Sequence, residues 1–207
     1  MKTCINKLPK AKIAKWCLPA LVIAVVALSI AWSDGGHRRY QLGGGWIGSG
    51  GAGIWNALQI PLDPAGRTAA LRVSSPTYSP QIAGLFAALG ATAGWSDNVG
   101  EVEMISRDTA RFGTLGYGRV EVPGNPLQVN TIFAMTGTVK YTGPDTFEVT
   151  YTINVYPVNI PATSPFYGLP NADVNGDGYP DPGAQPILIP GVLPIQGVDI
   201  AKRVTLR

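Results

Sequence analysis

Two neighbouring stretches of the chain alternate between apolar and polar positions. From Leu127 to Tyr141 the odd positions are mostly apolar and the even ones mostly polar, and a similar alternation runs from Phe147 to Tyr156. A period of two places the apolar side chains on one face of a β-strand. The residues between the stretches, TGPD (142–145), contain glycine and proline, which favour a turn. The pattern therefore predicts a β-hairpin of two long strands.

Shorter segments predict further strands on both sides of this hairpin. GIWNALQIPL alternates through Ile54, Leu58 and Ile60, and TAALRVS places Ala69 and Leu71 on one side. The segment 112–122 contains three glycines, which often mark a bulge or a bend of the kind that a barrel wall requires. The predicted segments are 53–62, 68–74, 101–107, 112–122, 186–192 and 198–206.

One helix is predicted among these strands, in SPQIAGLFAALG (79–90). Ser79 can cap the helix, Pro80 suits its first position, and Gly90 can end it in the left-handed conformation. The apolar residues recur at the spacing of one helical stripe; they are Ile82, Leu85, Phe86 and Leu89. We expect this short helix to lie across an open end or edge of the sheet and cover it.

These elements predict an all-β fold with one short helix, as a single-domain antiparallel β-barrel or strongly curved sheet. The 26 glycines, 18 prolines and low charge suit short strands joined by many turns. No repeat of fixed period divides the chain, and we assign residues 34–207 to one domain. Within it, residues 159–186 form a long irregular loop, a kind of segment that is usually either functional or disordered.

The N-terminal segment has the layout of a secretory signal peptide. Five lysines precede an uncharged apolar run from Leu18 to Ala31, which is shorter than the roughly 20 residues of a membrane-spanning helix. Cleavage after Ala31 or Ser33 would remove residues 1–33, and an uncleaved anchor is the alternative. We therefore expect an exported protein, periplasmic, cell-surface or secreted, with no stable membrane span after cleavage.

Removal of this leader changes which chemistry the chain can perform. Without the five leader lysines, 11 basic residues face 13 acidic ones, so the formal charge goes from +3 to −2 and the basis for expecting nucleic acid as a partner disappears. Cys4 and Cys17 leave as well, and His37 is the only histidine. Nucleophile pairs of the Ser-His or Cys-His type and zinc sites of imidazole and thiolate are thereby disfavoured.

Carboxylates remain as candidate catalytic groups. Glu101 and Glu103 lie two apart on a predicted strand and share one face, with their Cα atoms roughly 7 Å apart, which suits acid-base hydrolysis of a glycoside. The alternative is a solvated strand surface beside Arg107. The aromatic residues likewise form either a stacking platform for a glycan or an ordinary β core; they are Trp46, Trp55, Trp95, Tyr117, Tyr141, Tyr151 and Tyr156.

The glycine-rich segment GGGWIG has the G-x-G-x-x-G spacing of a dinucleotide site at Gly43, Gly45 and Gly48. That site needs a preceding strand and a following helix, and here the predicted cleavage region precedes and strand-like sequence follows. The segment is better interpreted as the entry strand. Its Gly44-x-Trp46 resembles the G-x-W of lipocalins, members of the calycin group, although their usual disulfide is missing. The resemblance implies an eight-stranded barrel, one end plugged by the Trp, and a cavity for a small apolar ligand.

The stretch DVNGDGYPD (173–181) is the most specific motif. Oxygen-bearing side chains on alternate residues, with Gly178 where the chain must bend sharply, are what a Ca²⁺ loop requires. In an EF-hand-like register the side-chain ligands are Asp173, Asn175, Asp177 and Asp181, with the backbone carbonyl of Tyr179 as a further ligand.

The motif departs from an EF-hand at two points. Ala184 stands where the bidentate Glu belongs, and Pro180 and Pro182 prevent an exiting helix. It more closely resembles the calcium loops of thrombospondin type 3 and dockerin-like segments, which implies one weak structural Ca²⁺. The alternative is a polar loop built from Asn-Gly and Asp-Gly turns.

The function that follows from these features is an exported, non-catalytic binding or cell-envelope-associated β protein with one calcium loop. Its partner would be a small apolar ligand or a glycan. Two alternatives remain: a carbohydrate-active hydrolase that uses Glu101 and Glu103, and a purely structural surface module. The last of these would have no ligand-sized cavity.

Overall fold

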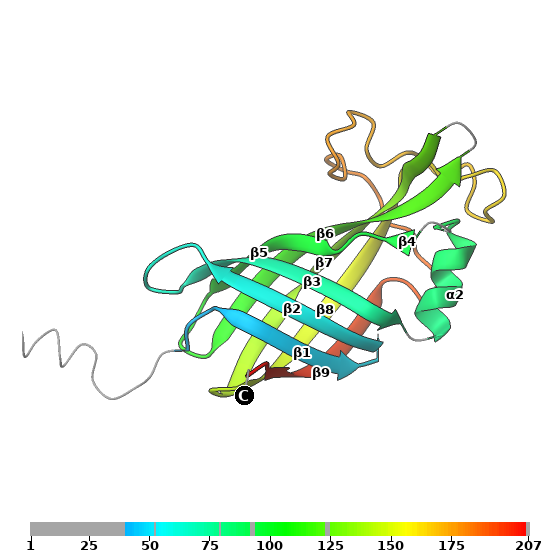
Figure 1. The fold of residues 1–207 in the computed structure, drawn as a ribbon. Helices are drawn as coiled ribbons and strands as arrows, with labels where there is room; N and C mark the ends of the chain where they lie inside the picture. Colours follow the sequence, from blue (N-terminus) through cyan, green and yellow to red (C-terminus); the bar gives the residue numbers. More distant parts are fainter. Residues whose placement is uncertain (1–39, 52, 79, 92–93, 123–124, 206–207) are drawn as a thin grey trace, which may run out of the picture. The chain divides into compact units, whose positions relative to one another are not determined.

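Eight antiparallel strands close into a barrel in the computed structural model of the protein (Figure 1). The structure describes residues 40–205 except 52, 79, 92–93 and 123–124, so the predicted signal peptide lies outside the described residues. The strands are β1 (Gly44–Gly50), β2 (Gly53–Pro61), β3 (Thr68–Tyr78), β4 (Gly94–Trp95), β5 (Asn98–Met104), β6 (Thr109–Val122), β7 (Asn125–Gly143), β8 (Thr146–Pro157) and β9 (Ile195–Arg203), and the helix is α2 (Pro80–Ala88).

The wall of the barrel follows the order of the chain. Strands that are neighbours in the sequence pair with one another from β1 to β3 and from β5 to β9, and β3 pairs with β5. The first strand, β1, pairs with the last, β9, which closes the circle. The short β4 pairs only with the distal part of β6 and is not part of the wall. The predicted all-β fold with one short helix is therefore confirmed, as a closed barrel.

The predicted hairpin is present as β7 and β8, in a register that pairs Val139 with Val149 and Tyr141 with Phe147. The predicted strand at 186–192 is wrong. Only an isolated bridge joins Ile189 to Leu193, because Pro190 and Gly191 turn the chain between them, with Gly191 at φ 74°.

Glycines inside the barrel make room for large side chains on the neighbouring strands. A side chain at Gly48 would overlap the indole of Trp55, and one at Gly137 would meet the ring of Phe112. Small and large residues thus alternate across adjacent strands, which is how a narrow barrel interior is filled. Of the glycines predicted to mark a bend, Gly118 likewise leaves room for the ring of Trp95, whereas Gly113 faces open space.

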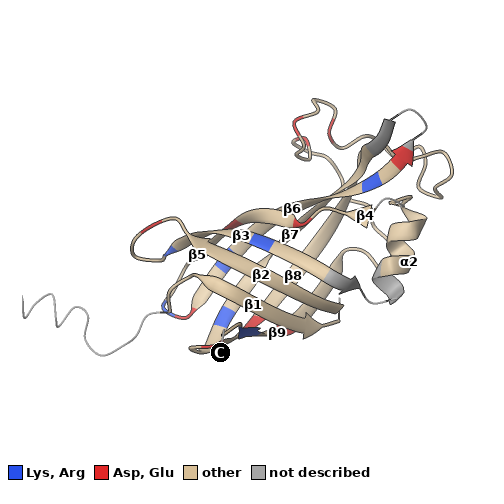
Figure 2. Cartoon of the chain, in the orientation of Figure 1, with Lys and Arg blue, Asp and Glu red and all other residues tan. Residues whose placement is uncertain are grey.

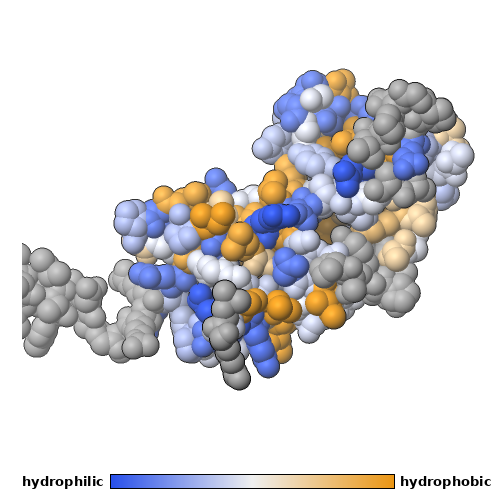
Figure 3. All heavy atoms as spheres, viewed as in Figure 1, coloured by the Kyte–Doolittle hydropathy of each residue, from blue (hydrophilic) through white to orange (hydrophobic). Residues whose placement is uncertain are grey.

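The face that β2 presents to the interior is the reverse of the expected one. Ile54, Leu58 and Ile60 point outward and are 44% to 55% exposed, whereas Trp55 and Gln59 point inward. Burying the large indole contributes more than burying any one of these aliphatic side chains, so it decides the orientation. In the view of Figure 3, hydrophobic side chains accordingly occur among hydrophilic ones on the outer surface.

One end of the barrel is packed around Trp46, which is completely buried. Its ring lies against Phe147 and Tyr141, with centroid distances of 4.5 and 5.9 Å. The guanidinium of Arg203 lies 4.4 Å from the Trp46 centroid and donates a hydrogen bond to the Gly43 carbonyl at 3.1 Å. The last strand is thereby fastened across the start of the first, and this end of the interior is filled.

The opposite end is covered by α2 (Figure 1), as the sequence predicted. Leu85 of the helix and Leu89 just after it form a second core cluster with residues of β7, β8 and the long loop; the other buried members are Phe133, Val155, Ile187 and Leu193. Gly90 ends the helix with φ 77°, in the expected left-handed conformation. No helix in the described part of the chain is long and apolar enough to cross a membrane.

The segment from 158 to 194 connects β8 to β9 without a helix or strand of its own. It is anchored at its start by the Val158 amide, which donates to the Asn130 carbonyl at 3.0 Å. Near its end the Ile187 amide donates to the Val155 carbonyl at 2.8 Å. The loop therefore lies beside the distal half of the β6–β7 hairpin and supplies side chains that close this end of the barrel (Figure 1).

Candidate functional site

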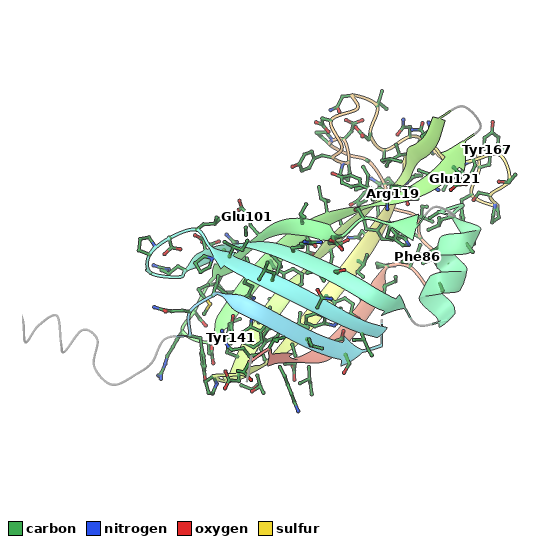
Figure 4. The ribbon with its side chains drawn as sticks, in the orientation of Figure 1. Phe86, Glu101, Arg119, Glu121, Tyr141 and Tyr167 are labelled. Carbon is green, nitrogen blue, oxygen red and sulfur yellow. The ribbon has the colours of Figure 1, made fainter. Side chains whose placement is uncertain are left out.

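A cavity of about 100 Å³ lies in the barrel between the two packed ends. Its walls are the inward side chains of the strands, and Phe86 of α2 and Trp95 of β4 bound it on the helix side, where Figure 4 labels Phe86. Most of the lining is apolar, including Leu71, Val73, Phe112, Met135, Phe147 and Val149. This composition suits a small molecule whose body is largely apolar.

One carboxyl group faces this apolar interior, that of Asp199 on β9. Its side chain is 1% exposed, and Oδ2 accepts a hydrogen bond of 2.7 Å from the indole N–H of Trp55. Oδ1 is buried and has no hydrogen-bond partner. Among the described residues, the cavity lining contains no Lys, Arg or His side chain to balance the acid.

Sequence reasoning missed Asp199 as a site residue. The signal lies in the alternation of β9, where Val198 and Ile200 are aliphatic and Asp199 between them is charged. That pattern predicts an outward Asp199, but Val198 and Ile200 are 57% and 61% exposed and Asp199 is buried. Only the strand pairing shows which face is inside.

Glu101 and Glu103 lie on the outer surface of β5, because their neighbours Val102 and Met104 point into the core. Glu101 is exposed on the outer side of the wall (Figure 4). Glu103 accepts hydrogen bonds from Arg111 on β6, the shorter at 2.8 Å. The pair borders a broad open groove rather than the barrel cavity. No observation in the described part of the chain favours hydrolysis over binding.

The aromatic residues do not share one exposed surface. Trp46, Tyr141 and Tyr151 are buried in the core, and Trp55 and Trp95 border the cavity. The arrangement is that of a core and a pocket wall. The glycines of the dinucleotide-like spacing lie in or just before β1, which is followed by strand β2 and not by a helix.

The predicted calcium loop is held by hydrogen bonds between its own side chains and backbone. Asp173 Oδ2 accepts from the Gly178 amide at 3.1 Å, and Asp181 Oδ2 accepts from the Val174 amide at 2.7 Å. Asp177 Oδ1 accepts from the Tyr179 amide at 2.8 Å, and Asp177 Oδ2 accepts from the Asn175 side-chain amide at 3.1 Å. Asp173 Oδ1 is buried without a hydrogen-bond partner.

These carboxylates give the loop a negative potential. No Lys or Arg occurs between 158 and 194, so all the Lys, Arg, Asp and Glu side chains of this loop are acidic ones (Figure 2). The Tyr117 hydroxyl donates to the Gly178 carbonyl at 3.1 Å. Burial raises the pKa of Tyr117, and electrostatic interactions with the ionisable groups of Tyr179, Asp173 and Asp177 raise it further. In the described part of the chain, no three His, Cys, Asp or Glu side chains lie close enough together to hold a metal ion.

The oxygen donors of the loop nevertheless match the chemistry of Ca²⁺, which binds carboxylate, amide and carbonyl oxygens. Asp173 Oδ1 is the oxygen best placed to bind a cation, because it is buried and accepts no hydrogen bond.

Comparisons with known proteins returned no relatives. No family model matches the chain, and neither the search of curated proteins nor the search of solved structures found a match.

Proposed function

We propose that the protein is an exported, non-catalytic binding protein that holds a small, largely apolar ligand inside its barrel. The observation that carries this proposal is the cavity of about 100 Å³ with apolar walls between two packed ends. Binding pockets for small molecules are concave and mostly apolar, with a few polar groups that fix the orientation of the ligand. A purely structural module would have no use for such a space, and the apolar walls favour this ligand over a glycan.

The proposal includes a lipocalin-like architecture. It is supported by Gly44-x-Trp46 at the first strand, by complete burial of Trp46 at one barrel end, and by the closed eight-stranded antiparallel wall. Export is supported by the charged and apolar pattern of residues 1–33.

A weak structural Ca²⁺ at the loop is the second part of the proposal. Asp173, Asn175, Asp177 and Asp181 would supply side-chain oxygens, and Tyr179 a backbone carbonyl. The support is their spacing, the unpartnered Asp173 Oδ1, and the absence of any basic residue from the loop sequence. The ion would neutralise the clustered charge and order the segment that helps to close the barrel.

Titration with toluene tests the binding site. An apolar cavity of about 150 Å³ can hold benzene. Because this cavity is smaller, at about 100 Å³, a single ring is the upper limit of probe size. We expect saturable binding, seen as a change in tryptophan fluorescence because Trp55 and Trp95 border the cavity. Val149→Phe, which fills the cavity, should weaken binding, whereas Val198→Phe on the outer surface should not. Absence of saturable binding to the wild-type protein would overturn the proposal.

A further inference from the structure

Asp199 is the charged residue among the mostly apolar side chains that line the cavity, and one of its carboxylate oxygens has no hydrogen-bond partner. A buried carboxyl group is normally satisfied by several donors or by a basic side chain. Here Trp55 supplies one donor, at 2.7 Å, and Oδ1 has none. None of the ion pairs between described residues involves Asp199.

The orientation of β9 also indicates that the burial of Asp199 has a role. Turning the strand by one residue would bury Val198 and Ile200 and expose Asp199, although it would also bring Gln196 and Lys202 to the inner face. The protein instead exposes both aliphatic side chains by more than half and buries the acid. Local rules of this kind are typically broken at functional sites.

The neighbouring backbone is adapted to this carboxyl group. Gly50 on β1 faces Asp199, and any side chain at Gly50 would collide with Asp199 Oδ1. Trp55 occupies the space over Gly48 in the same way and holds Oδ2. Two glycines on one strand thus leave room for the Trp55–Asp199 pair inside the barrel.

We propose that the cavity selects a small amine in its protonated form, whose ammonium group donates to Asp199 Oδ1 once a small rotation of the carboxyl group has moved this atom off Gly50. This inference rests on the proposed function, because it names the class of ligand for the same cavity. The aromatic rings of Trp55 and Phe147, whose centroids are 6.3 Å apart, border the same space and attract a cation through their faces. The volume limits the body of the ligand to no more than a single ring.

The same electrostatics exclude anionic ligands. A carboxylate placed in the cavity would meet Asp199 and, among the described lining residues, no basic side chain. Like charges in an interior of low dielectric constant repel strongly. Fatty acids and aromatic acids should therefore be rejected even though the walls are apolar.

Three probes of similar shape but different charge test whether the charge of the ligand determines binding. Benzylamine, toluene and benzoate are titrated into the wild-type protein at neutral pH, with binding followed by calorimetry. A charge-assisted hydrogen bond predicts that benzylamine binds about tenfold or more tightly than toluene, and that benzoate does not bind. Equal binding of toluene and benzylamine, or tighter binding of benzoate, would overturn this inference and leave the proposed function intact. Absence of binding by all three would overturn both.

Asp199→Asn provides the matched variant, since it keeps the shape and removes the charge. We expect its affinity for benzylamine to fall about tenfold or more, with toluene binding unchanged. The ligand-free variant should be at least as stable as the wild type, because a buried unpaired charge is removed. Glu148→Gln on the outside of β8 is the control for net charge and should bind all three probes as the wild type does. Unchanged benzylamine affinity in a folded Asp199→Asn protein would contradict the inference.

Discussion

Gly44 has two independent reasons to be glycine. Its φ of 87° lies in the left-handed region, which side chains other than hydrogen rarely adopt, and the guanidinium of Arg203 occupies the space where a Cβ would lie. The same Arg203 side chain covers the ring of Trp46 and donates a hydrogen bond to the Gly43 carbonyl, so displacing it would disturb both contacts. The Gly-x-Trp pattern of the entry strand is therefore explained by packing at one barrel end.

Tyr141, at the same end, should make stability depend on alkaline pH. Burial raises the pKa of Tyr141, and its contacts with Gln59 and Arg203 offset this only in part. Above about pH 10 the unfolded chain loses this proton while the folded protein keeps it. The free energy of unfolding should therefore decline as pH rises from about 10 through the folded pKa, by up to about 1 kcal/mol per pH unit.

Tyr141→Phe removes this dependence and keeps the ring that stacks on Tyr40 at 5.0 Å. In urea unfolding between about pH 9 and 11, the variant should lose stability less steeply than the wild type. Tyr167→Phe, whose ring is 65% exposed, is the control and should follow the wild type. Identical alkaline slopes for Tyr141→Phe and the wild type would contradict the assignment.

Among the elements, α2 shows how much depends on contacts that are distant in the sequence. The carbonyls at the C-terminal end of the helix are capped from elsewhere: the Ser164 hydroxyl donates to the carbonyl of Ala88, the last helical residue, at 2.8 Å, and Asn130 on β7 donates to the carbonyl of the next residue, Leu89, at 2.8 Å. Helix ends otherwise leave such carbonyls without partners. The position of α2 over the barrel end is thus fixed by a strand and by the long loop together.

Asn130→Ala should therefore destabilise the protein, by about 1 to 3 kcal/mol, because a buried carbonyl loses its donor. Asn130 is completely buried, whereas Asn159, which donates to the Val129 carbonyl at 3.4 Å, is exposed. Asn159→Ala is the matched control and should cost less than about 0.5 kcal/mol. Both values can be measured by urea unfolding. Equal losses would show that the cap on α2 contributes nothing specific.

The elements also show where prediction from sequence succeeds. The period of two in β7 and β8 and the apolar stripe of α2 are local patterns, and both are confirmed by the structure. The interior face of β2 and β9 was not predictable, because Trp55 and Asp199 point inward against the aliphatic alternation. Which face is inside depends on partners across the sheet, and these lie up to 144 residues apart for the Trp55–Asp199 pair.

At the scale of the whole molecule, closure joins the two ends of the described chain. Pairing of β1 with β9 makes the wall continuous, and the loop before β9 contributes Ile187 and Leu193 to the second core cluster. The order of this loop is therefore coupled to the stability of the barrel. Bound Ca²⁺ at its carboxylates should be visible as a change in global unfolding.

A thermal melt in EDTA and then in about 10 mM Ca²⁺ tests this coupling. With a dissociation constant on the order of 10⁻⁴ to 10⁻³ M, mass action stabilises the folded state by about 1.4 to 2.7 kcal/mol. For a domain of this size, the melting temperature should rise by about 3 to 10 °C. Mg²⁺ should raise it less, because it demands octahedral geometry and dehydrates reluctantly. Coincident melts in EDTA and Ca²⁺ would contradict the calcium proposal.

Asp177→Asn distinguishes a metal ligand from a turn residue. The amide can still accept the hydrogen bond from the Tyr179 backbone but not the one from the Asn175 side chain, and because that second bond is exposed, the melting temperature in EDTA should stay within about 2 °C of the wild type. Loss of one negative charge should weaken Ca²⁺ binding and reduce the Ca²⁺-dependent shift. Glu148→Gln, which removes an exposed carboxylate from the barrel wall, should leave that shift unchanged. An undiminished shift in Asp177→Asn would exclude Asp177 as a ligand, since the charge that attracts the ion is gone while the turn remains.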